Sequence, residues 1–171
     1  ACAPQAHIYD DFIIVKATSA DTLSSLARKY LNDPTKDWVI SEFNDIKTLD
    51  AGQELIIPLR PFDKCGLKVN GYQTVPVLAY QGFSKDSPGK MTVPAAAFEA
   101  QMKYLMENGY HVISLDQLLD FLDFKEQIPE KSVVITIDNG LSSFSDIAFP
   151  ILKKYGFTAT LFVYTDFIGN S

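Results

Sequence analysis

Ser132-Val133-Val134-Ile135-Thr136-Ile137-Asp138-Asn139-Gly140 is the stretch that decides the fold of the longer part of this 171-residue chain. Its first six residues are mostly β-branched and apolar, a composition that favours a strand. A short, near-continuous apolar run of this kind is typical of a strand buried on both faces of a parallel sheet. Asp138 is the first ionisable side chain after the run, so we expect it at the carboxyl end of the strand.

The sequence on both sides of this strand alternates between strand and helix patterns. Helix patterns separate the strand-like runs, and Gly109 and Gly156 follow two of these helices as stop signals. This alternation predicts an α/β fold in which about four parallel strands are covered by helices. The other predicted strands span residues 75–80, 111–115 and 160–165. The first predicted helix is capped by Thr92 and has Pro94 in its first turn. The second is capped by Asp116 and runs through Leu122, and the third spans residues 144–155.

The first 60 residues follow a different plan. A β-branched run at 12–16 predicts a strand, and the polar residues before it are predicted to be an irregular lead-in. A helix is expected after Asp21, a second helix at 38–44, and a second strand at 55–57 that can pair antiparallel with the first. We therefore predict three parts: a small β-α-α-β module over 1–60, a linker over 61–73 and an α/β domain over 74–171.

Composition excludes two classes of protein. Apolar residues make up 47% of the chain and charged residues 21%, as in an ordinary folded domain. The net charge is −6 and the pI is near 4.8, and no basic patch of the kind that binds nucleic acid is present. No apolar run approaches the roughly 18 residues that a membrane-spanning helix needs.

The start of the chain bears on its location in the cell. Ala1-Cys2-Ala3 lacks an initiator Met, which indicates an end left by removal of a signal peptide and predicts a secreted, extracellular or periplasmic protein. In an oxidising compartment Cys2 and Cys65, the two cysteines, would pair and close a loop of about 60 residues, worth roughly 4 kcal/mol. The alternative is two unpaired thiols in a cytosolic protein.

The first module resembles a LysM domain, a small carbohydrate-binding module. The resemblance rests on Val15, Asp21-Thr22-Leu23, Leu26-Ala27, Tyr30, Asn44, Leu49, Gly52-Gln53, Leu55 and Ile57-Pro58. It implies that N-acetylglucosamine-containing glycans bind between two loops, with Asp21, Thr22, Leu23, Gly52 and Gln53 as the binding residues. The alternative is that these residues only cap and pack a small fold.

The second module resembles the N-terminal half of a polysaccharide deacetylase domain. Thr136-Ile137-Asp138-Asn139-Gly140 is similar to the family's Thr-Phe-Asp-Asp-Gly motif, and Tyr80-Gln81 is similar to its Tyr-His pair. The pattern continues through Lys153-Lys154-Tyr155-Gly156-Phe157 and Ala159-Thr160-Leu161-Phe162. The resemblance implies a partial, distorted (β/α) barrel and metal-dependent removal of acetyl groups from N-acetylhexosamine polymers.

The same resemblance predicts that this chain has lost the family's metal site. In the family, one Asp and two His hold a divalent metal and a second Asp acts as general base. Asp138 matches the base, but Asn139 stands where the metal-binding Asp is expected, and Gln81 replaces the His of the first motif. His7 and His111, the two histidines, have no partner at metal-ligand spacing. We therefore expect no metal cofactor.

Two functional hypotheses follow. The first is a secreted pseudoenzyme that associates with glycans, or assembles into an oligomer or filament through an open barrel edge at residues 160–165, with Asp138 serving as a helix cap. The alternative is a polysaccharide deacetylase that binds a metal such as zinc, is completed by a companion chain and uses Asp138 as its base.

Overall fold

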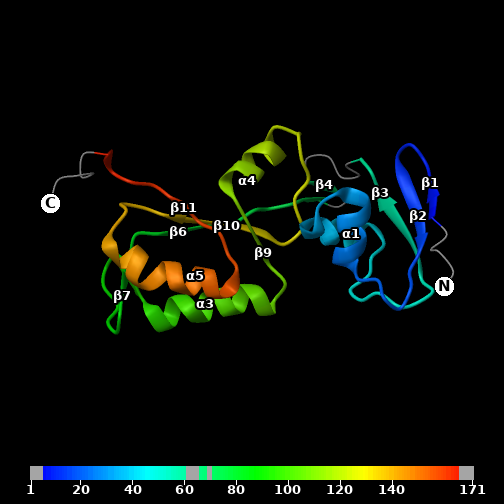
Figure 1. The fold of residues 1–171 in the computed structure, drawn as a ribbon. Coiled ribbons are helices and arrows are strands. Elements are labelled where there is room, and N and C mark those ends of the chain that lie inside the picture. Colours follow the sequence, from blue (N-terminus) through cyan, green and yellow to red (C-terminus); the bar gives the residue numbers. More distant parts are fainter. Residues whose placement is uncertain (1–5, 61–65, 69–70, 166–171) are drawn as a thin grey trace. The chain divides into compact units, whose positions relative to one another are not determined.

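The computed structural model describes residues 6–60, 66–68 and 71–165, which form two compact units, 1–64 and 65–171 (Figure 1). Each unit has a hydrophobic core of its own. Cys2 and Cys65, the predicted disulfide partners, lie outside the described residues. Within the described ranges, no helix is long and apolar enough to cross a membrane.

The first unit is an antiparallel sheet with helices packed against it. The sheet order is β1 (Ala6–Ile8), β2 (Phe12–Lys16) and β3 (Glu54–Pro58), and the helices are α1 (Leu23–Leu31), a 3-10 turn (Pro34–Lys36) and α2 (Asp37–Phe43). The strands and helices predicted between residues 12 and 58 are present, but the irregular lead-in was wrong because residues 6–8 form β1. Three residues are too short a run to show a strand period, and it is pairing with Ile13–Val15 that makes them a strand.

Asn44, which follows α2, protects the open edge of this sheet. Its side-chain Nδ2 donates to the carbonyl oxygens of Ile56 (2.7 Å) and Ile40 (2.8 Å), and its Oδ1 accepts from the Ile56 N–H (2.9 Å). The amide thus occupies both backbone groups of Ile56 as a neighbouring strand would. Unpaired edge groups invite pairing with other chains, and this side chain removes two of them.

The second unit is built on a parallel sheet whose central strand is β10 (Ser132–Ile137). β6 (Val77–Tyr80), β9 (His111–Ile113) and β11 (Thr160–Leu161) all pair with β10 in parallel, which confirms the predicted parallel sheet. β11 has two residues where six were predicted: Thr160 and Leu161 pair with β10, and beyond them the Phe162 N–H adds one more backbone bond, to the Ile137 carbonyl. Two short pairs complete the unit: β4 (Leu67–Lys68) with β5 (Gly71–Tyr72), inside the predicted linker, and β7 (Gly82–Ser84) with β8 (Thr92–Pro94).

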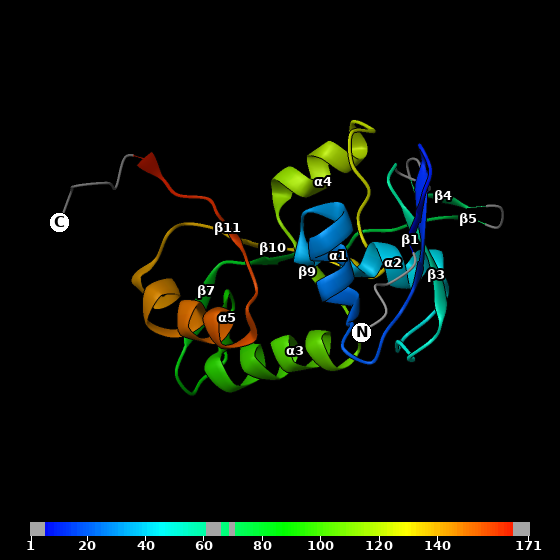
Figure 2. The same cartoon turned by 45° about the vertical axis from the view of Figure 1, so that its right-hand side comes forward.

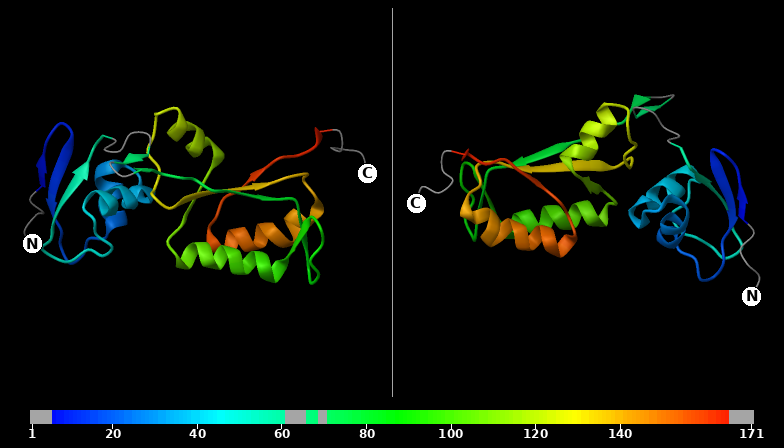
Figure 3. Two further views of the ribbon diagram at one scale, coloured as in Figure 1. Left: turned by 180° about the vertical axis from the view of Figure 1, so that it is seen from behind. Right: turned by 45° about the horizontal axis from the view of Figure 1, so that its top comes forward.

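Helices cover the two faces of β10 differently. Val133, Ile135 and Ile137 pack on one face against α3 (Ala95–Glu107) and α5 (Phe149–Tyr155), which lie side by side (Figures 2 and 3). Val134 points to the other face and packs with Phe121 of α4 (Leu115–Leu122). This alternation follows from the two-residue period of a strand and explains why every residue of β10 is buried.

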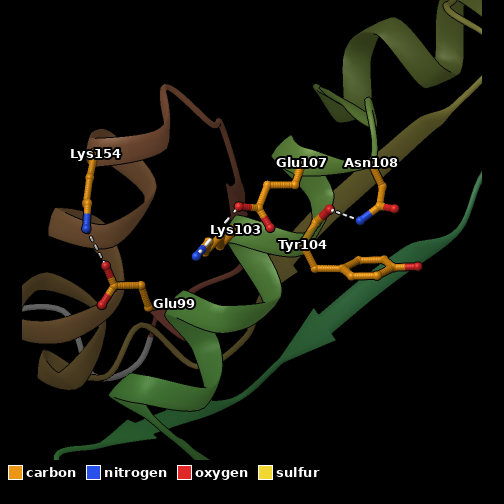
Figure 4. Close-up of polar contacts among 6 residues, drawn as sticks. All are labelled: Glu99, Lys103, Tyr104, Glu107, Asn108 and Lys154. Atoms are coloured by element: carbon orange, nitrogen blue, oxygen red, sulfur yellow. Dashed lines mark hydrogen bonds and ion pairs between the residues drawn. The ribbon is translucent and has the colours of Figure 1, made fainter.

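The contact between α3 and α5 is mainly apolar. Lys154 of α5 pairs with Glu99 of α3 at 2.5 Å, and Lys103 pairs with Glu107 along α3 at 3.6 Å (Figure 4). Both pairs are exposed, and exposed pairs add little to stability. The buried Phe98 and Met102 of α3 are therefore what hold the helices on the sheet.

Two predicted helix caps were wrong. Thr92 lies in β8, and the N-cap of α3 is Pro94. The N-cap of α4 is Ser114, not Asp116. Ser114 Oγ accepts from the Gln117 N–H (3.1 Å), and Gln117 Oε1 accepts from the Ser114 N–H (2.9 Å). The reciprocal pair satisfies two free backbone donors at once, so it fixes the helix start two residues earlier. A π-helical turn at Phe144–Ala148 precedes α5, and Gly156 ends α5 in the left-handed conformation as predicted.

Candidate functional site

The carboxyl ends of three neighbouring strands place Gln81, Asp138 and Phe162 in one row. The register pairs Ile137 with Tyr80 on one side and with Leu161 on the other, so the next residue of each strand lies at the same level. Two backbone bonds fix the row: the Asp138 N–H donates to the Tyr80 carbonyl (2.8 Å) and the Phe162 N–H donates to the Ile137 carbonyl (2.8 Å). Strand ends of a parallel sheet are where such folds commonly bind ligands.

These strand ends enclose a pocket of about 310 Å³, which we name the strand-end pocket. One part of its lining is polar and the other is aromatic or aliphatic. The lining residues are Gln81, Asp138, Asn139, Phe162, Val163 and Tyr164. The structure therefore brings together the three residues singled out as site candidates in the second module. It adds Phe162, which the longer family-like pattern contains without a site role, together with Val163 and Tyr164.

The turn after β10 shapes the pocket. Asn139 (φ +75°) and Gly140 (φ +63°) both adopt the left-handed conformation, in which Asn and Gly are the commonest residues. A Cβ atom on Gly140 would lie 2.8 Å from Cγ1 of Val163. Glycine is therefore needed here for two reasons, and the close approach brings the residues after β11 against the turn that carries Asp138.

The Asp138 carboxylate is half-buried and makes no hydrogen bond to any residue in the described part of the chain. In particular, it does not bond to the first turn of the following helix, which was the structural role considered for it. A different side chain joins the loops there: Ser143 Oγ accepts from the Phe83 N–H at 3.3 Å. Asp138 is thus available to a ligand in the strand-end pocket.

The donor set of this pocket does not fit the metal site implied by the family resemblance. It offers one carboxylate, from Asp138, and the neutral amides of Asn139 and Gln81. His111 pairs with Ser132 at the opposite end of β10, and His7 lies in β1 of the first unit. Across residues 6–60, 66–68 and 71–165, no three His, Cys, Asp or Glu side chains are grouped as metal ligands.

In the first unit, the two loops predicted to bind glycan lie next to each other. The Gly52 N–H donates to the Ala17 carbonyl (2.8 Å), and the Ala17 N–H donates to the Gln53 carbonyl (2.8 Å). Gly52 adopts φ +88°, which favours glycine. The Gln53 side chain accepts from the Asp50 N–H (3.1 Å) and closes its own loop.

In the other loop, Asp21, Thr22 and Leu23 were predicted to bind glycan, and each has a defined structural role. Asp21 Oδ2 accepts from both the N–H (2.8 Å) and the hydroxyl (2.6 Å) of Thr18, and these bonds hold the pKa of Asp21 below its ordinary value. Thr22 caps α1 through a reciprocal pair with Ser25, and Leu23 packs against the core. Asp21, Thr22 and Leu23 therefore each have a structural role in the start of α1.

A larger groove of about 650 Å³ has Tyr80 of the first motif in its wall. It runs along β6 and α3 and is lined mainly by apolar residues of Pro76–Tyr80 together with Gln101, Tyr104 and Tyr110. Apart from Tyr80, no motif residue lines this groove, because its walls come from separate elements of the sequence.

Comparison with known proteins identifies the second unit's relatives. Residues 125–171 match the family model described as Polysaccharide deacetylase. The second unit resembles polysaccharide deacetylases. The Bacillus subtilis protein YxkH is named as a polysaccharide deacetylase. It is 38% identical to this chain over 96 residues, which cover 56% of this chain and 34% of YxkH. The Escherichia coli poly-beta-1,6-N-acetyl-D-glucosamine N-deacetylase is 38% identical over 69 residues, covering 40% of this chain and 10% of that enzyme.

Solved structures agree with this assignment of the fold. The Streptococcus pyogenes deacetylase PplD, in complex with acetate, has a TM-score of 0.52 at 29% identity and covers 57% of this chain and 46% of that one. A de-N-acetylase from Aggregatibacter actinomycetemcomitans has a TM-score of 0.52 at 28% identity, with 57% and 40% covered. The chain thus spans about a third or less of the curated relatives and less than half of these structures.

Proposed function

We propose that this chain is a secreted glycan-associated protein whose strand-end pocket binds an N-acetylglucosamine-containing glycan without deacetylating it. The observation that carries the proposal is the identity of residue 139. An amide beside Asp138 supplies hydrogen bonds but lacks the negative charge of the Asp expected at this position, so its affinity for a divalent cation is much lower. We therefore expect the pocket to bind a glycan through its hydrogen-bonding groups but not to hold the metal ion that deacetylation needs.

The polar groups of the pocket suit an acetamido sugar. The amides of Gln81 and Asn139 can each donate and accept, as an acetamido group does, and the Asp138 carboxylate can accept from a sugar hydroxyl. A pocket with a few placed polar groups and an apolar remainder is the usual form of a small-ligand site.

The first unit is proposed to act as a second, LysM-like glycan-binding module. Its two converging loops present Asp21, Thr22 and Leu23 on one side and Gly52 and Gln53 on the other. Two glycan sites on one chain would raise the apparent affinity for a polymer, because the second site then binds at a high effective concentration.

The second candidate is a polysaccharide deacetylase in which Asp138 is the general base. Two observations favour it: the Asp138 carboxylate lines the pocket and bonds to no side chain or backbone group of the described residues, and the relatives bear deacetylase names. A carboxylate that reaches a water or hydroxyl at hydrogen-bond distance can take its proton. The residues of the pocket do not complete the implied metal site, so proton transfer to Asp138 is the one catalytic role that they support.

Metal content and acetate release distinguish the two candidates. We would purify the full chain without chelators, measure bound zinc and other divalent metals, and assay acetate release from an N-acetylglucosamine oligomer. We expect less than one equivalent of metal and no turnover. One equivalent of metal together with turnover that Asp138→Asn abolishes would refute the non-catalytic proposal.

Asn139→Asp is the matched variant for this test. Asp also tolerates the left-handed conformation, so the fold should be kept while a second carboxylate is added beside Asp138. We expect divalent-cation affinity, measured by calorimetry with zinc, to rise at least about tenfold over the parent chain. Equal zinc binding by both proteins would show that residue 139 does not limit metal binding.

We also propose association with a second copy or a companion chain through an open sheet edge. The edge predicted from the sequence is at residues 160–165, where β11 is the last strand of the described sheet, and β6 forms a second edge at the other end. The bonds from β10 to the carbonyls of Pro76 and Tyr80 turn the backbone groups of Val77 and Ala79 away from β10, and no described strand pairs with them. Val77 is also 50% exposed. Analytical ultracentrifugation should detect oligomers at micromolar concentration; a monomer there would refute self-association.

A further inference from the structure

We infer that Phe162 is the stacking residue of the strand-end pocket, the aromatic surface on which the apolar face of one sugar ring rests. The inference rests on the proposed glycan binding and adds a binding residue that the motifs around Gln81 and Asp138 do not contain. Phe162 lies opposite Asp138 in the row of strand ends and lines the same pocket, while 49% of the residue remains exposed. An aromatic side chain that lines the same pocket as a carboxylate and two amides supplies the apolar part of a small-ligand site.

The backbone fixes where this ring can be. The Phe162 N–H donates to the Ile137 carbonyl at 2.8 Å, and Val163 packs on Gly140 in the turn that carries Asp138 and Asn139. Both contacts tie residues 162–163 to the end of β10. The position of the ring relative to Asp138 therefore depends on sheet register and on a glycine contact, and not on a free loop.

The two sides of the pocket match the two kinds of surface on a pyranose ring. Its C–H groups form an apolar face, and its hydroxyl and acetamido groups lie around the edge. With the apolar face on Phe162, the polar edge meets Gln81, Asp138 and Asn139, which supply the hydrogen bonds. Phe162 thus contributes apolar contact and orientation, and the polar groups select the substituents.

The test is an NMR titration of the full ¹⁵N-labelled chain with an N-acetylglucosamine tetramer. The amides of Gly140 and Val163 report on the strand-end pocket, and the amide of Gly52 reports separately on the first unit. We expect Phe162→Ala to weaken binding about tenfold at Gly140 and Val163, and to leave the Gly52 curve unchanged. Phe162→Trp should retain the affinity, whereas Phe162→Leu should not, because the flat aromatic surface is what is lost.

Phe149→Ala is the matched control, because Phe149 is similarly exposed (52%) but does not line the pocket. It should bind as the parent chain does. If Gly140 and Val163 shift in the parent chain and Phe162→Ala binds equally well, the inference is refuted while glycan binding stands. If these two amides do not shift in the parent chain, glycan binding at this pocket is refuted together with the inference.

Discussion

Replacing Gly140 with alanine tests whether the close approach to Val163 holds the strand-end pocket together. At φ +63° an alanine costs about 1–2 kcal/mol relative to glycine, and about 0.4–1 kcal/mol returns because the unfolded chain loses freedom. The new Cβ would also lie 2.8 Å from Val163 Cγ1 and 3.4 Å from Val163 Cβ, and overpacking of this kind costs about 1–3 kcal/mol. We expect Gly140→Ala to lower the free energy of unfolding of the second unit by about 2–3 kcal/mol.

Gly156→Ala separates the backbone cost from the clash. Gly156 has nearly the same φ (+67°), but a Cβ there meets nothing within 4 Å. Its loss should be only about 1 kcal/mol. The double variant Gly140→Ala/Val163→Ala removes the clashing methyl group and should recover most of the difference between the two single variants.

The assay is native-state hydrogen exchange of the buried β10 amides, which reports the unfolding free energy of the second unit without a contribution from the first. Equal losses for Gly140→Ala and Gly156→Ala would refute the reasoning. So would a double variant no more stable than Gly140→Ala, because the cost would then not arise at Val163.

Two predictions concern the first unit. Asn44→Ala should lower its unfolding free energy by about 1–2 kcal/mol because three hydrogen bonds are lost at a partly exposed edge. Trp38, the single tryptophan, reports the unfolding of this unit by fluorescence. Asn108→Ala in the second unit, followed by hydrogen exchange of the β10 amides, removes one exposed bond and should cost its unit less than half as much; equal losses would contradict the edge-protection role. The lowered pKa of Asp21 means that its contribution to stability is present above the ordinary Asp value near 3.8 and is lost as the pH falls through the lower folded value. Thr18→Ala should bring the pKa of Asp21, followed by carboxyl NMR, back toward that ordinary value. The stability of the first unit should then depend less on pH in the acid range. An unchanged titration of Asp21 would show that Thr18 does not lower its pKa.

Local pattern was sufficient wherever one segment settles its own conformation. The buried β10 strand follows from its β-branched apolar run, and the end of α5 follows from Gly156, because both signals lie within a few residues. The cap of α4 shows the limit of this reasoning. Ser114 and Asp116 are both suitable capping residues, and the reciprocal bond with Gln117 decides between them.

The sequence by itself determined the parallel α/β character of the second unit, the position of Asp138 at a strand end and the absence of an acid at residue 139. Only the tertiary structure decided which residues meet there. Strand register between Tyr80, Ile137 and Leu161 aligns Gln81, Asp138 and Phe162, and these residues are separated by up to 81 positions in the chain. Phe162 was predicted only as part of an open edge strand, because an apolar residue has the same local pattern whether it lines a pocket or continues a ladder. Its exposure beside Asp138 depends on β11 ending at Leu161, which is set by pairing with β10 and not by neighbouring residues.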